Sequence, residues 1–193
     1  MKKLLCVFLV VLTLAFATAC TSTPASVVTR GVIADKVYTN TMDDFTITVS
    51  EDWAFSSDED IAALLGASAD EIKAENFSAV AQKMTIVYDV MAYDSKTGAS
   101  VIVGYHNLGL SYDVLPDEQQ YIKDIGTEAG VHMEQGDKTL GDNTYRFGYA
   151  NVTSTDTAYS QSYCVKRIDD YMMVIIFTAP AGYDMTAMES MFG

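Results

Sequence analysis

Residues 171–178, YMMVIIFT, are apolar at nearly every position. Successive side chains of a β-strand point to opposite faces of a sheet, so a strand with this sequence must be buried on both faces. Pro180 and Gly182 follow at once, and such residues end regular structure. The stretch therefore predicts the central strand of a sheet that is covered on both sides.

Several further strands are predicted around this one, because short apolar or alternating runs are separated by turn residues. Phe45, Ile47 and Val49 alternate with polar residues, which is typical of a half-buried strand. The other predicted strands are 84–93, 99–107, 143–151 and 159–167, with a possible short one at 131–136. Asp169 and Asp170 form a tight turn before residue 171, and such short connections make neighbouring strands antiparallel.

Helices are predicted between these strands. Ser57 caps a helix that Gly66 ends, and a second helix over 69–82 follows a capping box. A third runs from Pro116 to Gly130, and Asp184 caps a last one. The order predicts an α+β fold, in which helices cover both faces of an antiparallel sheet.

The N-terminus has the pattern of an export signal. Lys2 and Lys3 precede an apolar run over 4–17, whose helical length of about 21 Å is short of a ~30 Å hydrocarbon core. The small residues directly before Cys20 resemble the lipobox of bacterial lipoproteins. This resemblance implies cleavage of a 1–19 signal peptide and a diacylglyceryl group on Cys20; an ordinary secretion site is the alternative.

One domain is predicted after the signal. Residues 20–35 are rich in Thr, Ser and Ala and are interpreted as the lipidated Cys20 and a flexible tether. Residues 36–193 then form a single globular domain, large enough to bury a core of its own. The protein is expected to be exported and attached to the cell membrane outside the cytoplasm.

Charge and cysteine content limit the possible functions. The chain has 26 acidic and 12 basic residues, a balance that repels the phosphates of nucleic acid. Beyond Cys20 only Cys164 remains, so no disulfide is expected within the domain. Cys164 lies in an apolar strand pattern and is predicted to be a small buried hydrophobe.

Residues 44–55, DFTITVSEDWAF, resemble the opening strand of the PsbP/Mog1-like superfamily, with matches at Phe45, Ile47, Val49 and Trp53. Ser50 stands where a proline is usual. The resemblance implies an α/β/α sandwich around an antiparallel sheet. It also implies a kinship with small secreted bacterial lipoproteins and with accessory proteins that bind or help assemble a partner. It supplies no catalytic residues.

No catalytic, metal or cofactor site is predicted. A nucleophilic triad of His106, Ser111 and Asp113 is geometrically possible, but nothing beyond residue type supports it. The histidines lack the spacing of metal ligands. An envelope hydrolase that uses a pair of carboxylates stays open as an alternative, since such enzymes need no histidine.

Four residues at the exit of the 99–107 strand are predicted to bind a ligand: Tyr105, His106, Tyr112 and Asp113. Tyrosine offers both apolar area and a hydroxyl, which suits contact surfaces. We therefore expect a binding or accessory module without catalytic activity, attached to the membrane through Cys20 and contacting an envelope protein. A structural envelope lipoprotein is a further alternative.

Overall fold

The structure is a computed structural model that describes residues 27–152 and 158–193. The predicted signal peptide, Cys20 and the first part of the predicted tether lie outside the described residues. Ten strands are present: β1 (Val32–Ala34), β2 (Val37–Asn40), β3 (Phe45–Thr48), β4 (Trp53–Phe55), β5 (Ile86–Asp94), β6 (Ser100–Asn107), β7 (Glu134–Leu140), β8 (Asn143–Val152), β9 (Tyr159–Ile168) and β10 (Tyr171–Pro180). The helices are α1 (Asp58–Leu65), α2 (Ala74–Ala81), α3 (Leu108–Ser111), α4 (Glu118–Ala129) and α5 (Met185–Glu189).

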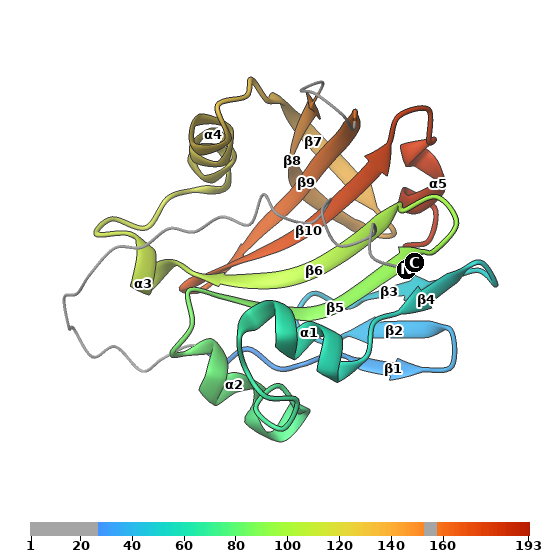
Figure 1. The fold of residues 1–193 in the computed structure, drawn as a ribbon. Helices are drawn as coiled ribbons and strands as arrows, with labels where there is room; N and C mark the ends of the chain where they lie inside the picture. Colours follow the sequence, from blue (N-terminus) through green and yellow to red (C-terminus); the bar gives the residue numbers. More distant parts are fainter. Residues whose placement is uncertain (1–26, 153–157) are drawn as a thin grey trace.

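A seven-stranded antiparallel sheet forms the centre of the domain, in the order β4-β5-β6-β10-β9-β8-β7 (Figure 1). The prediction from YMMVIIFT is confirmed, because β10 is the middle strand of the seven. Its side chains alternate between two apolar clusters. Met173 and Ile175 belong to one cluster, whereas Met172 and Val174 belong to the other, so both faces of β10 are buried.

The two faces of this sheet are covered by different structures. One face packs against α4 and α1, through residues such as Ile122 and Ile61. The close approach of α4 depends on Gly148, because a Cβ there would lie 2.5 Å from Ile122 Cγ2. The other face packs mainly against a second, three-stranded sheet in the order β1-β2-β3, which contributes Phe45 and Ile47.

Helices on both faces are not confirmed. On the second face the small sheet takes the place of a complete helical layer, and the short helices α2 and α5 add a few side chains, such as Phe77 and Ala81 from α2 and Met188 from α5. The structure thus shows an α+β fold with a large antiparallel sheet. Among the described residues, none of the helices has the length and apolar character needed to cross a membrane.

The helix termini follow the capping signals in most cases. Ser57 and Asp117 accept hydrogen bonds at the starts of α1 and α4, and left-handed Gly66 and Gly130 end them as predicted. The second helix was expected to begin at residue 69 but begins at Ala74. Its capping-box bonds are made within a turn at 68–71, which does not continue into the helix.

The tether prediction is wrong for residues 27–35. Val28 is fully buried in the core, and Val32–Ala34 pair with β2 as strand β1. Small polar residues upstream suggested a flexible segment, but tertiary hydrogen bonds fix these residues to the domain. The folded part of the chain therefore already includes residues that were assigned to the tether.

Candidate functional site

Strand β5 contains a bulge at Asp89, where its pairing with β6 shifts by one residue between Tyr88 and Val90. The extra residue turns the Asp89 side chain toward the small sheet, although Asp89 lies in an otherwise apolar strand. The strands approach closely here, because a Cβ at Gly104 would lie 2.8 Å from the carbonyl oxygen of Val87. A carboxylate is thereby placed inside the core, with only 1% of Asp89 exposed.

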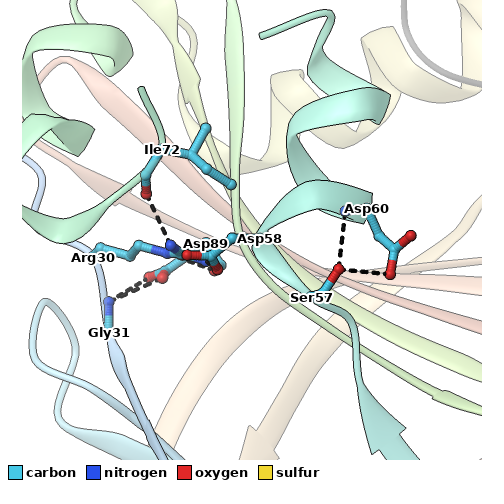
Figure 2. A network of polar contacts seen from close by, with 7 residues as sticks. All are labelled: Arg30, Gly31, Ser57, Asp58, Asp60, Ile72 and Asp89. Atoms are coloured by element: carbon cyan, nitrogen blue, oxygen red, sulfur yellow. Dashed lines mark hydrogen bonds and ion pairs between the residues drawn. The ribbon is translucent and has the colours of Figure 1, made fainter. Parts of the chain in front are cut away.

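Hydrogen-bond donors from the N-terminal part of the fold bind the Asp89 carboxylate, and Figure 2 shows the bond from Gly31. The Gly31 amide donates to Oδ1 at 2.9 Å, and the Tyr38 hydroxyl donates to Oδ2 at 2.7 Å. Asn40 Nδ2 in turn donates to the hydroxyl oxygens of Tyr38 and Tyr105, at 2.8 Å each. Residues of β2, β5, β6 and the segment before β1 are thus joined in one buried network, which we call the Asp89 network.

Arg30 completes the attachment of the N-terminal segment. Its guanidinium group donates to Asp58 Oδ1 at 2.7 Å and to the carbonyl oxygen of Ile72 at 2.9 Å, as Figure 2 shows. The Arg30 side chain is almost fully buried, whereas Asp58 is partly open to solvent. The ion pair joins the start of the folded chain to the first turn of α1.

Burial raises the pKa of Asp89 to about 6, against the lowering effects of the hydrogen bonds from Tyr38 and Gly31 and of the Arg30 charge. The carboxyl group has no open path to a ligand, since it is buried and its oxygens accept bonds from the protein. Its geometry fits a role in holding residues 28–40 onto the main sheet.

A second buried polar centre lies on the opposite face, around His106. Nδ1 of His106 lies 2.8 Å from the Tyr121 hydroxyl of α4, and Nε2 lies 2.6 Å from the Ser111 hydroxyl of α3. Burial lowers the pKa of His106 to about 4, so the imidazole is neutral near pH 7. We call these three residues the His106 bridge, because they link β6 to both helices.

The contact between Ser111 and His106 has the separation of a nucleophile and its base. The remaining ring nitrogen, however, faces the hydroxyl of Tyr121, whose own pKa burial raises well above its usual value. In the part of the chain that the structure describes, both ring nitrogens face hydroxyl groups and no carboxylate is paired with the ring to stabilise an imidazolium ion, which a base must become. The arrangement therefore fits a positioning role for His106.

The structure separates the four residues that the sequence grouped as a ligand site. Tyr105 points into the Asp89 network on one face, while His106 points to the other face. The ring centroids of Tyr112 and His106 lie 6.0 Å apart, and Asp113, the next residue, is exposed. Tyr112 and Asp113 are accessible to a partner, whereas Tyr105 and His106 are fully buried. Ligand binding by these residues stays a prediction.

Exposed apolar side chains lie next to Tyr112 in the loop that follows β6. Val114 is 83% exposed, and Leu110 is also exposed. Large apolar side chains in such positions are typical of contact surfaces when they cluster with aromatic residues. We call residues 108–116 the α3 loop; the His106 bridge fixes it through Ser111.

Sequence reasoning missed the Asp89 network. The available signal was the single charge within 84–93, MTIVYDVMAY, because a charge in a strand buried on both faces needs partners. Arg30 and Tyr38 could not be assigned to it from the sequence, since they are separated from Asp89 by more than 50 positions.

A third polar centre lies at Asp43, whose carboxylate accepts a hydrogen bond from the Tyr145 hydroxyl at 2.8 Å and pairs with Lys166. Across 27–152 and 158–193, no three His, Cys, Asp or Glu side chains are grouped so that they could hold a metal ion. Cys164 is a free thiol and is buried, as predicted, and burial raises its pKa to about 12. Such a thiol has little nucleophilic thiolate.

Comparisons with known proteins give likenesses of fold. No family model and no curated protein matches the chain. A protein from Bacteroides thetaiotaomicron VPI-5482 is similar with a TM-score of 0.45 and 11% identity, over 80% of this chain and 45% of that chain. A point mutant of the protein Mog1 is similar with a TM-score of 0.41 and 14% identity, over 74% of this chain and 76% of that one.

Proposed function

We propose that the protein is a lipid-anchored, extracytoplasmic binding or accessory module without catalytic activity. The observation that carries this proposal is the pattern of residues 2–20, a basic start, an apolar run and small residues before Cys20. Two acyl chains on Cys20 would hold the protein stably at a membrane. The domain that follows includes Val28, which is buried, and residues 32–34, which pair with β2, so few residues separate Cys20 from the fold.

The α3 loop is the surface that we assign to a protein partner. It combines exposed Val114 and Leu110 with the half-buried ring of Tyr112 and the exposed carboxylate of Asp113. Apolar and aromatic side chains at the centre of a contact, with polar groups around them, are typical of protein interfaces. The His106 bridge supports binding by holding the loop in one conformation, which lowers the entropy lost on association.

A non-catalytic role is supported by the state of the one histidine near a serine. His106 is held neutral between two hydroxyl groups and has a pKa of about 4. A general base works best when its pKa lies near the working pH, so this imidazole is a weak base. Its hydrogen bonds to Ser111 and Tyr121 hold α3 and α4 in position.

The proposal is tested by affinity capture of the full chain from its native membrane, with an intact mass of the N-terminal peptide from the same sample. We expect a diacylglyceryl group on Cys20 and a recurrent protein partner. The Val114→Asp variant should lose the partner, whereas Leu64→Asp should keep it, because Leu64 is an exposed aliphatic residue of α1 outside the loop.

Two results would contradict the proposal separately. An unmodified Cys20 would remove the anchor. Turnover of an ester or peptide substrate that is abolished by Ser111→Ala would show an enzyme, and the His106 bridge would then need to be assigned to catalysis.

A further inference from the structure

Strand β1 is the outer strand of the small sheet, and its side chains are exposed. Val32 is 60% exposed and Ile33 is 40% exposed. Natural sheets commonly protect an outer strand with charged side chains. Strand β7, at an edge of the large sheet, follows this rule with Glu134, Asp137 and Lys138, whereas β1 has the uncharged sequence VIA.

The chain that leads to β1 comes directly from the proposed anchor. Val27, the first described residue, is 60% exposed and is the seventh residue after Cys20. Seven residues reach at most about 25 Å even when fully extended. Val28 is buried, and Arg30 and Gly31 are bound to the domain, so the point at which the chain leaves the fold is fixed.

We propose that β1 forms a lipid-contacting edge, which approaches the interface of the bilayer that holds Cys20 edge-on, so that Val32 and Ile33 on the two faces of the strand both contact lipid. The inference rests on the lipid anchor of the proposed function and deepens it, since it gives the domain an orientation. Aliphatic side chains near a lipid anchor add apolar area to the membrane contact. The domain is then held at two places, by acyl chains and by β1.

The local charge agrees with a lipid surface as the occupant. The charged residues that directly follow β1 in the chain are Asp35 and Lys36, which are exposed and have opposite signs. Before β1, Arg30 is paired with Asp58, so the charges that flank the strand in sequence balance, although the whole chain has a formal net charge of −14. Anionic headgroups repel an acidic surface, so a neutral apolar edge approaches them at lower electrostatic cost.

The edge can be tested with tryptophan in place of an exposed aliphatic residue. The full lipidated protein is reconstituted into vesicles of phosphatidylethanolamine and phosphatidylglycerol that contain brominated lipid, as Ile33→Trp and separately as Val114→Trp. The native Trp53 is buried and gives the same background in both variants. We expect emission of the Ile33→Trp variant to shift to shorter wavelength and to be quenched at least twofold more than that of Val114→Trp.

The outcomes separate this inference from the proposed function. Protein that fails to float with the vesicles would contradict the anchor. Protein that floats, but in which the Ile33→Trp variant is quenched no more than Val114→Trp, would overturn the lipid-contacting edge alone. A disulfide-linked dimer of the Ile33→Cys variant in the same vesicles would also overturn it, because β1 would then face a second copy of the chain.

Discussion

Asp89 and His106 are both buried in the centre of the domain, on opposite faces of the large sheet, and they hold different parts of the chain. Asp89 binds Gly31 and Tyr38, and so fixes the segment that leads toward Cys20. His106 binds Ser111 and Tyr121, and so fixes the α3 loop and α4. The first centre contains an acid and the second a base, so burial gives them opposite responses to pH.

The response of Asp89 follows from its raised pKa. The folded pKa is about 6 and the ordinary value is 3.8, so the folded protein binds the Asp89 proton more tightly than the unfolded chain does. The resulting stabilisation is complete below about pH 4 and is lost as the pH rises through 6.

His106 behaves in the opposite way, because its folded pKa of about 4 is below its ordinary value of 6.5. The folded protein disfavours the imidazolium ion. The stabilisation of the folded state by neutral His106 is therefore complete above pH 6.5 and is lost as the pH falls toward 4. Between pH 4 and 6 the two centres oppose each other, and the stability of the native chain should change less than that of a variant lacking either group.

The largest effect is expected for Gly31→Ala. A Cβ at this position would lie 2.4 Å from Tyr38 Cε2 and 2.6 Å from the carbonyl oxygen of Thr39, and the latter is a backbone atom that cannot rotate away. We expect the free energy of unfolding to fall by about 3 kcal/mol or more. Urea denaturation of the Cys20→Ser chain measures it. The control is Gly136→Ala in β7, where a Cβ meets no atom within 4 Å; equal losses in the two variants would contradict the packing argument.

A somewhat smaller change in the free energy of unfolding is expected when Asp89 or His106 is replaced, so that the pH response of the other group can be measured alone. In Asp89→Asn the loss of stability on going from pH 7 to pH 4 should exceed that of the native chain by about 2 kcal/mol, since each pKa unit corresponds to about 1.4 kcal/mol and the shift from 3.8 to about 6 is not fully expressed at pH 4. His106→Gln should show the reverse difference, of similar size. Urea denaturation at pH 7, 5.5 and 4 measures both. If the two variants change in the same direction, the opposition of the two centres is refuted.

The smallest effect is expected for Ser111→Ala, which removes one hydrogen-bond partner of His106. The ring nitrogen is then buried without a partner, which costs about 1–2 kcal/mol. Ser190→Ala serves as the control, because the Ser190 hydroxyl is exposed and bonds only the nearby Ala187 carbonyl oxygen. Thermal unfolding of the two variants should differ by several degrees; a loss no greater than that of the control would mean that Ser111 does not hold the loop.

Strands β5, β6, β8, β9 and β10 and the helices α1 and α4 could be predicted from the sequence because their signals are local, whereas β4 was not predicted and β7 lies at Glu134–Leu140 instead of 131–136. The apolar run at 171–178, the Ser57 cap and the Pro116–Gly130 pattern each act through neighbouring residues, and the structure agrees with them. The small sheet could not be predicted in full. Strand β1 has only three residues, and the segment before it is held in place by the bond from Gly31 to Asp89, which lies more than 50 positions away.

The candidate site was only partly predictable for a similar reason. Tyr112 and Asp113 of the α3 loop were predicted as binding residues because tyrosine and charge gather at the end of a strand, and the structure leaves both accessible. The alternation of side chains places Tyr105 and His106 on opposite faces, so a single site containing both was not compatible with a regular strand. The bulge at Asp89 has no signature in the sequence beyond one charge in an apolar run.

The separate roles of Asp89 and His106 are tested most directly by hydrogen–deuterium exchange in Asp89→Asn and His106→Gln at pH 7. We expect Asp89→Asn to increase exchange in residues 28–40 and to leave the α3 loop unchanged, whereas His106→Gln should increase exchange in the α3 loop and leave residues 28–40 unchanged. If either variant increases exchange equally in residues 28–40 and in the α3 loop, Asp89 and His106 do not hold separate parts of the chain.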